Sequence, residues 1–257
     1  MADIYEEIVR VRVEGEEAAL VTIVSAKGST PREEGTKMLV KADGSIVGSI
    51  GGGSLEAQVC DQAREVIRKG RPQRVHISLT AKEGEELGML CGGDVEVFIE
   101  PILSQPTLYI FGGGHISLPL AKMAKLAGLK VAVVDDRAEF ANPQRFPEAE
   151  LTLAEDFNTA FSRLQIGKSS YIVIVTRAHQ SDELVLEQAL GTPAKYIGMI
   201  GSKAKCKAIF SHLLAKGIPQ EQLDKVHAPI GLEINAQTPE EIAVSILAEM
   251  IKVRRSG

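Results

Sequence analysis

The sequence has few cysteines, and none of them are paired at the spacings that bind zinc or build a disulfide framework. Its three cysteines, Cys60, Cys91 and Cys206, lie far apart along the chain. This spacing excludes a zinc ribbon and a disulfide-stapled fold, and we expect reduced thiols. No long run of lysine or arginine occurs, and the formal charge is -5. The sequence therefore indicates neither a broad nucleic-acid surface nor a polybasic membrane patch.

Long uninterrupted apolar segments are also absent. The uncharged stretch 102–121 contains prolines, three successive glycines and a histidine, so we expect no membrane-spanning helix. The N-terminal residues alternate charged and apolar side chains, unlike a signal peptide, and we expect a cytoplasmic protein. Hydrophobic residues make up 44% of the chain and charged residues 25%, which excludes a disordered or fibrous protein.

Residues 1–104 predict a compact α+β domain. Apolar residues at helical spacing alternate with short runs typical of strands. Ser54 is a candidate N-cap for the second helix, and Gly70 is suited to end it. The expected order is helix, three strands, helix and two strands, over residues 2–14, 18–25, 37–41, 45–47, 54–70, 74–79 and 95–100.

A segment rich in proline and polar residues, 101–106, separates this domain from a second one, and we place the boundary between residues 104 and 105. Strands and helices alternate over residues 105–257, which predicts a Rossmann-like, doubly wound parallel sheet. The last helix has a complete capping box, with Thr238 as N-cap and Glu241 three residues on. The expected strands are 107–111, 130–134, 151–153, 171–175 and 195–200, and the expected helices before the last are 115–127, 159–164, 182–190 and 203–216.

Gly112, Gly113 and Gly114 follow a predicted strand and lead into a predicted helix. Backbone N–H groups at such a turn face a pyrophosphate, so the context favours a nucleotide or another phosphate-bearing ligand. Asp135 ends the next strand, where an acid holds a ribose 2′-OH and disfavours NADP. The alternative is a glycine turn whose ligand site is unused.

A second glycine-rich loop opens the second helix. Three consecutive glycines exceed what a tight turn requires, and they reduce the stability of the folded chain by their conformational freedom. The free N–H groups of the helix start predict an anion or another closely approaching ligand. The alternative is a tight strand-to-helix turn. The candidate binding residues are Ser49, Gly51, Gly52, Gly53 and Ser54.

Cys91 is the cysteine best placed for chemistry, because two glycines follow it. Their N–H groups can lower the pKa of a thiol, and a thiolate suits a soft metal or a sulfur-bearing ligand. The alternative is a small buried side chain. We expect Cys60 on the interior side of a helix and Cys206 on an exposed helix, and we give neither a function.

Polar residues follow other predicted strands of the second domain. His115 and His179 are candidates for ligand contact or acid–base chemistry. The alternative for His115 is a side chain that only satisfies a backbone partner. Asp182 either pairs with His179 or caps the next helix, and no third ligand nearby supports a metal site. Further candidate phosphate contacts are Gly201, Ser202 and Lys203, and the alternative for these residues is a helix cap.

Seven motifs spread over most of the chain occur together in one order. They are GSTPREEGTKMLV (28–40), GSIGGGSLE (48–56), CGGDVEVFIEP (91–101), IFGGGHISLPLAKMA (110–124), VVDDR (133–137), YIGMIGSKAK (196–205) and HAPIGLEINAQTPEEIAVSILAEM (227–250). In this combination the sequence resembles the XdhC/CoxI family of accessory proteins for molybdenum hydroxylases.

The resemblance implies an XdhC-like domain followed by a Rossmann domain, in a chaperone rather than an enzyme. Such a protein binds the molybdenum cofactor, supports its sulfuration with a cysteine desulfurase, and inserts it into an apoenzyme of the xanthine dehydrogenase type. Cys91 would be the contact to molybdenum, and a homodimer is expected. Where many members carry Thr-His-x-His, this chain has Thr176, Arg177, Ala178 and His179, so a role that needs both histidines is not expected.

Two other functions stay open at this point. Gly112 and Asp135 are also what an NAD-dependent oxidoreductase would show, with His115 or His179 as its acid or base, although no substrate-binding arginine clamp is visible. A non-catalytic nucleotide-sensing module is the second alternative. NAD is therefore a second candidate cofactor beside the molybdenum cofactor.

Overall fold

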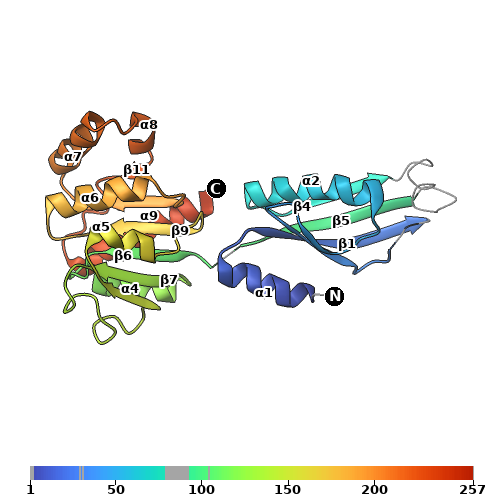
Figure 1. Cartoon of the computed structure of the whole chain (residues 1–257), viewed down its shortest axis with the longest axis horizontal. Helices are drawn as coiled ribbons and strands as arrows, with labels where there is room; N and C mark the ends of the chain where they lie inside the picture. Colours follow the sequence, from blue (N-terminus) through green and yellow to red (C-terminus); the bar gives the residue numbers. More distant parts are fainter. Residues whose placement is uncertain (1–2, 29, 31, 79–92, 104, 257) are drawn as a thin grey trace. The chain divides into compact units, whose positions relative to one another are not determined.

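The computed structural model describes residues 3–28, 30, 32–78, 93–103 and 105–256. The chain divides into two compact units, Met1–Ser104 (unit 1) and Gln105–Gly257 (unit 2), and each is described by itself (Figure 1). In the described ranges, no helix is long and apolar enough to cross a membrane.

Unit 1 is an antiparallel sheet with a helix against each face (Figure 1). Its strands follow the order β3-β2-β1-β5-β4. Each neighbouring pair of strands is antiparallel. Antiparallel strands that follow one another in the chain can be joined by short loops. The elements are α1 (Ile4–Glu14), β1 (Ala18–Gly28), β2 (Lys37–Lys41), β3 (Ile46–Gly48), α2 (Gly53–Lys69), β4 (Gln73–Ser78) and β5 (Gly93–Ile102).

The alternation of side chains along β1 explains why both faces of this sheet carry a helix. Ala19 and Val21 are buried in a cluster with residues of α2, whereas Ala18 and Leu20 are buried in a cluster with Val11 of α1. Successive side chains of a strand point to opposite faces, so a strand segment that is apolar at successive positions, as residues 18–21 are, needs cover on both sides.

Helix α2 begins differently from the prediction. Its N-cap is Gly52 and its first residue is Gly53, so the prediction that Ser54 caps the helix is wrong. The glycines at 51, 52 and 53, which precede Ser54, have positive φ. This conformation lets the chain enter the helix before it reaches the serine. Gly70 ends the helix in the left-handed conformation, as predicted.

Unit 2 is a six-stranded parallel sheet in the order β11-β10-β9-β6-β7-β8. Numbered within the unit, this is the order 6-5-4-1-2-3 of dinucleotide-binding sheets, so the predicted Rossmann-like fold is confirmed. The elements are β6 (Thr107–Phe111), α4 (Ser117–Leu126), β7 (Lys130–Asp135), β8 (Leu151–Ala154), α5 (Phe157–Ala160), the short helix η1 (Phe161–Arg163), β9 (Ser170–Ile174), α6 (His179–Leu190), β10 (Tyr196–Met199), α7 (Lys203–Ala215), α8 (Gln220–Leu223), β11 (Val226–His227) and α9 (Pro239–Ser256).

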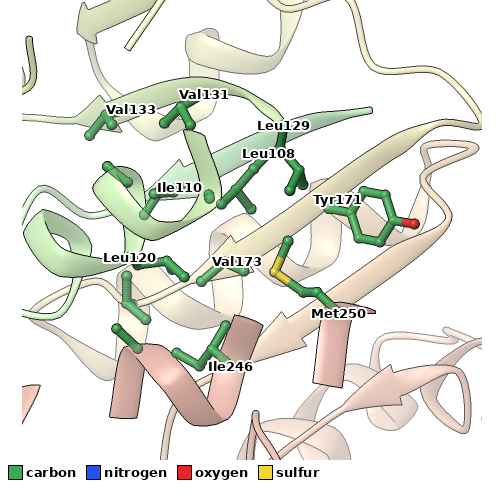
Figure 2. Close-up of a cluster of buried hydrophobic side chains, with 14 of the residues drawn as sticks. Leu108, Ile110, Leu120, Leu129, Val131, Val133, Tyr171, Val173, Ile246 and Met250 are labelled. Carbon is green, nitrogen blue, oxygen red and sulfur yellow. The ribbon is translucent and has the colours of Figure 1, made fainter. Parts of the chain in front are cut away.

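Each face of this parallel sheet is buried under helices. On one face, Leu108 and Ile110 of β6 pack with Leu120 of α4 and Ile246 of α9 (Figure 2). The opposite side chains of β6 belong to a second cluster with residues of α5, α6 and α7. Because both faces are covered, the polar atoms that can reach a ligand lie at the ends of the strands.

Some predicted boundaries shift, and two short elements were not predicted. Helix α4 begins at Ser117 rather than His115. Helix α6 begins at His179 rather than Asp182, because the N–H of Asp182 already donates to the carbonyl of Ala178. Strand β11 and helix α8 are too short to show a periodic pattern. Cys206 is 3% exposed in the apolar cluster of α6 and α7, so its predicted exposure is wrong.

Candidate functional site

The carboxyl edge of the parallel sheet brings together the glycine loop and the acid that the sequence singled out. In open sheets of this kind, ligands bind outside the carboxyl ends of the strands, where the strand order reverses. The reversal lies between β6 and β9. The loop of Gly112, Gly113 and Gly114 (the 112–114 loop) follows β6, and Asp135 ends the adjacent strand β7. Strand pairing therefore makes the loop and the acid neighbours.

The 112–114 loop is packed against the protein on one side and open on the other. Gly112 has a φ of 106°, and a Cβ there would overlap the carbonyl oxygen of Val175. A Cβ at Gly113 would overlap the carbonyl oxygen of Phe140. A Cβ at Gly114 would meet no described atom within 4 Å. The third glycine is therefore the position at which another molecule can approach the backbone.

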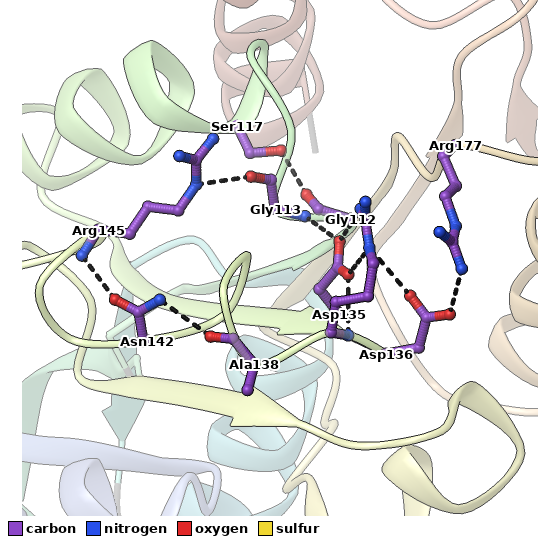
Figure 3. Close-up of polar contacts among 10 residues, drawn as sticks. Gly112, Gly113, Ser117, Asp135, Asp136, Ala138, Asn142, Arg145 and Arg177 are labelled. Carbon is purple, nitrogen blue, oxygen red and sulfur yellow. Dashed lines mark hydrogen bonds and ion pairs between the residues drawn. The ribbon is translucent and has the colours of Figure 1, made fainter.

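Two side chains hold the carbonyl groups of this loop (Figure 3). The buried hydroxyl of Ser117 donates to the carbonyl oxygen of Gly112, and Nε of Arg145 donates to that of Gly113 at 3.0 Å. Oδ1 of Asn142 accepts the backbone N–H of Arg145 at 2.9 Å, which fixes the backbone from which the arginine side chain extends. Sequence reasoning missed Arg145, because it lies 32 residues after the glycine that it contacts.

Asp135 is hydrogen-bonded within the protein rather than directed to solvent. It is 2% exposed, and its Oδ2 accepts the N–H of Gly113 at 2.8 Å. Its Oδ1 accepts the backbone N–H of Arg137 at 3.1 Å and the side-chain Nε–H of the same residue at 2.9 Å. Burial raises the pKa of this carboxyl, but the bonds from Arg137 and Gly113 outweigh it and hold the pKa below its ordinary value. Asp135 is therefore a carboxylate that holds the 112–114 loop in place.

The two candidate histidines lie at helix starts of the same unit. His115 is in the turn before α4 and His179 is the first residue of α6, and both are exposed. Neither side chain makes a hydrogen bond or ion pair with another described residue. In the same described ranges, no group of three His, Cys, Asp or Glu residues could hold a metal ion. Their roles stay predictions from the sequence.

Asp182 holds the loop after β9 instead of pairing with His179. It is fully buried, and its Oδ1 accepts the hydroxyl of Thr176 at 2.6 Å and the N–H of Thr176 at 3.2 Å. Lys205 forms an ion pair with its other oxygen. These contacts join the loop to α6 and α7.

The third predicted phosphate contact has the geometry of a helix cap. Ser202 is the N-cap of α7, and its Oγ accepts the N–H of Lys205 at 3.2 Å. A Cβ at Gly201 would lie 2.8 Å from the side chain of Lys205. Lys203 is exposed at the first position of the helix. Of these three residues, Lys203 alone presents a side chain free to meet an anion.

The second glycine-rich loop (the 49–54 loop) is folded around a carboxylate that was not predicted. Oε1 of Glu56 accepts the hydroxyl of Ser49 at 2.7 Å and the N–H groups of Ile50 and Gly52, each at 3.0 Å. Burial raises the pKa of Glu56, but these bonds outweigh it and lower the pKa overall. The signal available in the sequence was the acid four residues after Gly52, close to capping-box spacing.

Glu56 leaves part of this loop unsatisfied. The N–H groups of Gly53 and Ser54 donate to no described residue. The Ser54 hydroxyl oxygen is buried and also has no hydrogen-bond partner among the described residues. Buried polar groups in proteins are nearly always paired, so an unpaired hydroxyl at a helix start is the kind of group that a polar ligand satisfies. Cys91, the third element of the predicted site, lies outside the described residues.

Comparison with known proteins then decides the family. The model of the XdhC Rossmann domain matches residues 108–250, which is most of unit 2 and more than half of the chain. The model of the XdhC and CoxI family matches residues 11–78 in unit 1. The chain belongs to the XdhC and CoxI family.

Relatives of this XdhC-family chain include proteins linked by name to molybdenum enzymes. Uncharacterized protein YqeB of Escherichia coli K12 is 34% identical over 99% of the chain, which spans 47% of YqeB, about half its length. The molybdenum cofactor insertion chaperone PaoD of the same organism is 24% identical over 99% of the chain and 90% of PaoD. A solved structure named a xanthine dehydrogenase, from Bacillus halodurans, is 25% identical with a TM-score of 0.53, over 100% of this chain and 96% of that one.

Proposed function

We propose that this XdhC-family chain is a maturation factor for molybdenum hydroxylases. It binds the molybdenum cofactor, supports its sulfuration by a cysteine desulfurase, and inserts it into an apoenzyme of the xanthine dehydrogenase type. The observation that carries the proposal is the similarity to PaoD, a molybdenum cofactor insertion chaperone, over nearly the full length of both chains. The Bacillus halodurans relative, named a xanthine dehydrogenase, supports the class of client enzyme.

The two glycine-rich loops suit the phosphate group of the cofactor. The N–H groups of Gly114 and His115 donate to no described residue, and they precede the ten-residue helix α4. In unit 1, the N–H groups of Gly53 and Ser54 and the Ser54 hydroxyl, which have no partner in the described ranges, offer the same kind of donor. Such donors at a helix start bind phosphate without a positive side chain. The cofactor is the cargo, and we propose these residues as its contacts.

A thiolate is the expected contact to molybdenum or to the sulfur that is transferred. Cys91 fills that role in the proposal, because its two following glycines leave room for a ligand. His115 and His179 are exposed side chains that can contact the cofactor or the cysteine desulfurase. We further propose a homodimer, the commonest assembly of oligomeric proteins.

The test measures molybdenum and pterin bound to the purified chain, and activity recovered when the chain is mixed with a hydroxylase apoenzyme that lacks its cofactor. We expect both to exceed the values for an unrelated protein expressed in the same cells. Molybdenum at background together with no activation would reject the proposal. Sedimentation of the purified chain tests the homodimer separately, since a monomer at micromolar concentration would exclude it.

The role of Cys91 is tested by Cys91→Ser, which should reduce molybdenum retention because a hydroxyl is a poor substitute for a thiolate. Cys60→Ser is the matched control. Cys60 is half-buried at the edge of its cluster, whereas Cys206 is buried and would lose packing energy as serine. Equal molybdenum content in Cys91→Ser and Cys60→Ser would leave the glycine-rich loops as the binding determinants.

A further inference from the structure

The sheet of unit 2 has the strand order that binds dinucleotides, yet its own side chains occupy the side of the 112–114 loop that faces β7. In such sheets the dinucleotide crosses the reversal point, and an acid at the end of the second strand accepts the ribose 2′-OH. β7 is the second strand of the unit and Asp135 is its acid. A ribose can bind here only if this carboxylate keeps a free acceptor position.

The contacts of Asp135 leave it no free acceptor position toward a ribose. Its two oxygens receive the N–H of Gly113 and three N–H groups of Arg137. The guanidinium contacts both oxygens, through Nε at 2.9 Å and Nη2 at 3.2 Å. A ribose diol would have to displace a bidentate, charge-assisted pair from a carboxylate that is 2% exposed.

Arg137 is in turn fixed by its own surroundings. Its guanidinium carbon lies 3.6 Å from the centre of the Phe140 ring, a cation–π contact. The N–H of Phe140 donates to the carbonyl of Arg137 at 2.9 Å, so the two residues form one turn. The carbonyl of Phe140 fills the space beside Gly113. The turn 137–140 therefore packs against the first part of the loop, where the adenosine half of a dinucleotide would lie.

A second ion pair spans the end of β6 itself (Figure 3). Nη2 of Arg177, in the loop after β9, lies 3.0 Å from Oδ2 of Asp136, in the loop after β7. β7 and β9 are not neighbours, since β6 separates them. With strands about 4.8 Å apart, the pair bridges about 10 Å over the point where the 112–114 loop begins.

We infer that Arg137, Phe140 and the Arg177–Asp136 pair are specificity-determining residues that exclude adenosine dinucleotides from unit 2. Each fills or bridges part of the adenosine side of the loop with groups of the chain itself. A site rejects one of two ligands that share a phosphate when the chain itself fills the space and pairs the polar groups that this ligand would need. Gly114 and the start of α4 stay open, so a phosphate-bearing ligand without an adenosine can still approach. This inference holds whether or not the chain carries the molybdenum cofactor.

The first test is thermal unfolding of the full chain with 1 mM NAD, ADP-ribose or no ligand. A ligand present at about 100 times its Kd would raise Tm by about 5 °C or more. We expect no shift with either nucleotide. A rise of that size with NAD would overturn the inference.

The second test distinguishes an Asp135 carboxylate that stabilises the 112–114 loop from one that is free to bind a ligand. Asp135→Asn should lower Tm by about 4 °C or more without any nucleotide, because it breaks a buried, bidentate pair. Asp61→Asn is the matched control, since Asp61 is 74% exposed and its pair with Arg64 is at the surface. An Asp135→Asn chain that unfolds at the wild-type temperature would show a carboxylate free for a ribose and would contradict the inference.

Discussion

Tyr196 donates its hydroxyl hydrogen to Oε2 of Glu249 across 2.6 Å, which joins the first residue of β10 to the last helix. The same oxygen accepts the N–H of Gly231 at 3.0 Å, and the ring of His227 stacks on Tyr196 with centroids 4.6 Å apart. Burial raises the pKa of Tyr196, and the adjacent carboxylate raises it further. The tyrosine therefore stays protonated and acts as a fixed donor among three segments distant in sequence.

Tyr196→Phe should lower the free energy of unfolding of the chain by about 1–2 kcal/mol. The substitution keeps the buried ring but removes a donor from a half-buried carboxylate. Tyr5→Phe is the control, because Tyr5 is 62% exposed on α1. Urea unfolding of both variants and the wild type measures the difference. The same free energy for both variants would show that the Tyr196 bond adds nothing to stability.

Asp182→Asn should destabilise the chain by about 3 kcal/mol. The variant leaves the ammonium of Lys205, 15% exposed, without its anion in a buried position. Asp224→Asn is the control, since Asp224 is exposed and accepts a side-chain bond from Gln220 at 2.7 Å. Denaturant unfolding measures both. A loss of stability no larger than that of the control would contradict the central role of Asp182.

Glu56→Gln should reduce stability at neutral pH by about 1 kcal/mol, because a neutral amide accepts the three bonds of the 49–54 loop more weakly. The folded pKa of Glu56 is lowered, so its contribution is present above the unfolded pKa and is lost as pH falls through the folded pKa. The difference between wild type and variant should therefore shrink on acidification below about pH 4.3. Calorimetry at pH 7 and at acidic pH tests this.

The control for that experiment is Glu65→Gln, in the same helix. Glu65 lies on the surface and pairs with Arg68 and Lys69. We expect a smaller loss at pH 7 than for Glu56→Gln, because exposed pairs are screened by solvent. A gap between wild type and Glu56→Gln that widens on acidification has the wrong sign for a carboxylate with a lowered pKa.

Gly113→Ala and Gly114→Ala should have opposite consequences. A Cβ at Gly113 overlaps the carbonyl of Phe140, so Gly113→Ala should cost about 2 kcal/mol of stability or more. A Cβ at Gly114 meets no described atom within 4 Å, and stability should change by less than about 1 kcal/mol. On the proposed function, the added methyl at residue 114 should instead lower molybdenum retention. Retention at the wild-type level in Gly114→Ala would place the phosphate elsewhere.

Residues 1–104 and 105–257 should fold as separate polypeptides. Each of the four buried clusters draws its residues from one unit, so neither piece loses its core when the chain is divided. Expression of both pieces and thermal unfolding by circular dichroism tests this. A piece without a cooperative transition would show that it depends on the other.

Much of the fold follows from local patterns that can be seen in the sequence. The capping box of α9 forms as predicted, since Oγ1 of Thr238 accepts the N–H of Glu241 at 3.2 Å and Glu241 accepts that of Thr238 at 3.1 Å. Residues three apart at a helix start are adjacent in space whatever the rest of the chain does. The alternation of strands and helices likewise predicts the parallel sheet, because the crossover rules leave few arrangements.

The tertiary structure decided what the glycine-rich loops do. The sequence predicted free N–H groups at both loops, but Glu56 and Asp135 each accept some of them. Asp135 reaches Gly113 across 22 residues, and Arg177 reaches Asp136 across 41. The sequence by itself determined which elements form, because helical and strand periods depend on near neighbours. Which carboxylate fills which loop depends on how distant strands pair and how their side chains share space, and only the folded chain fixes that.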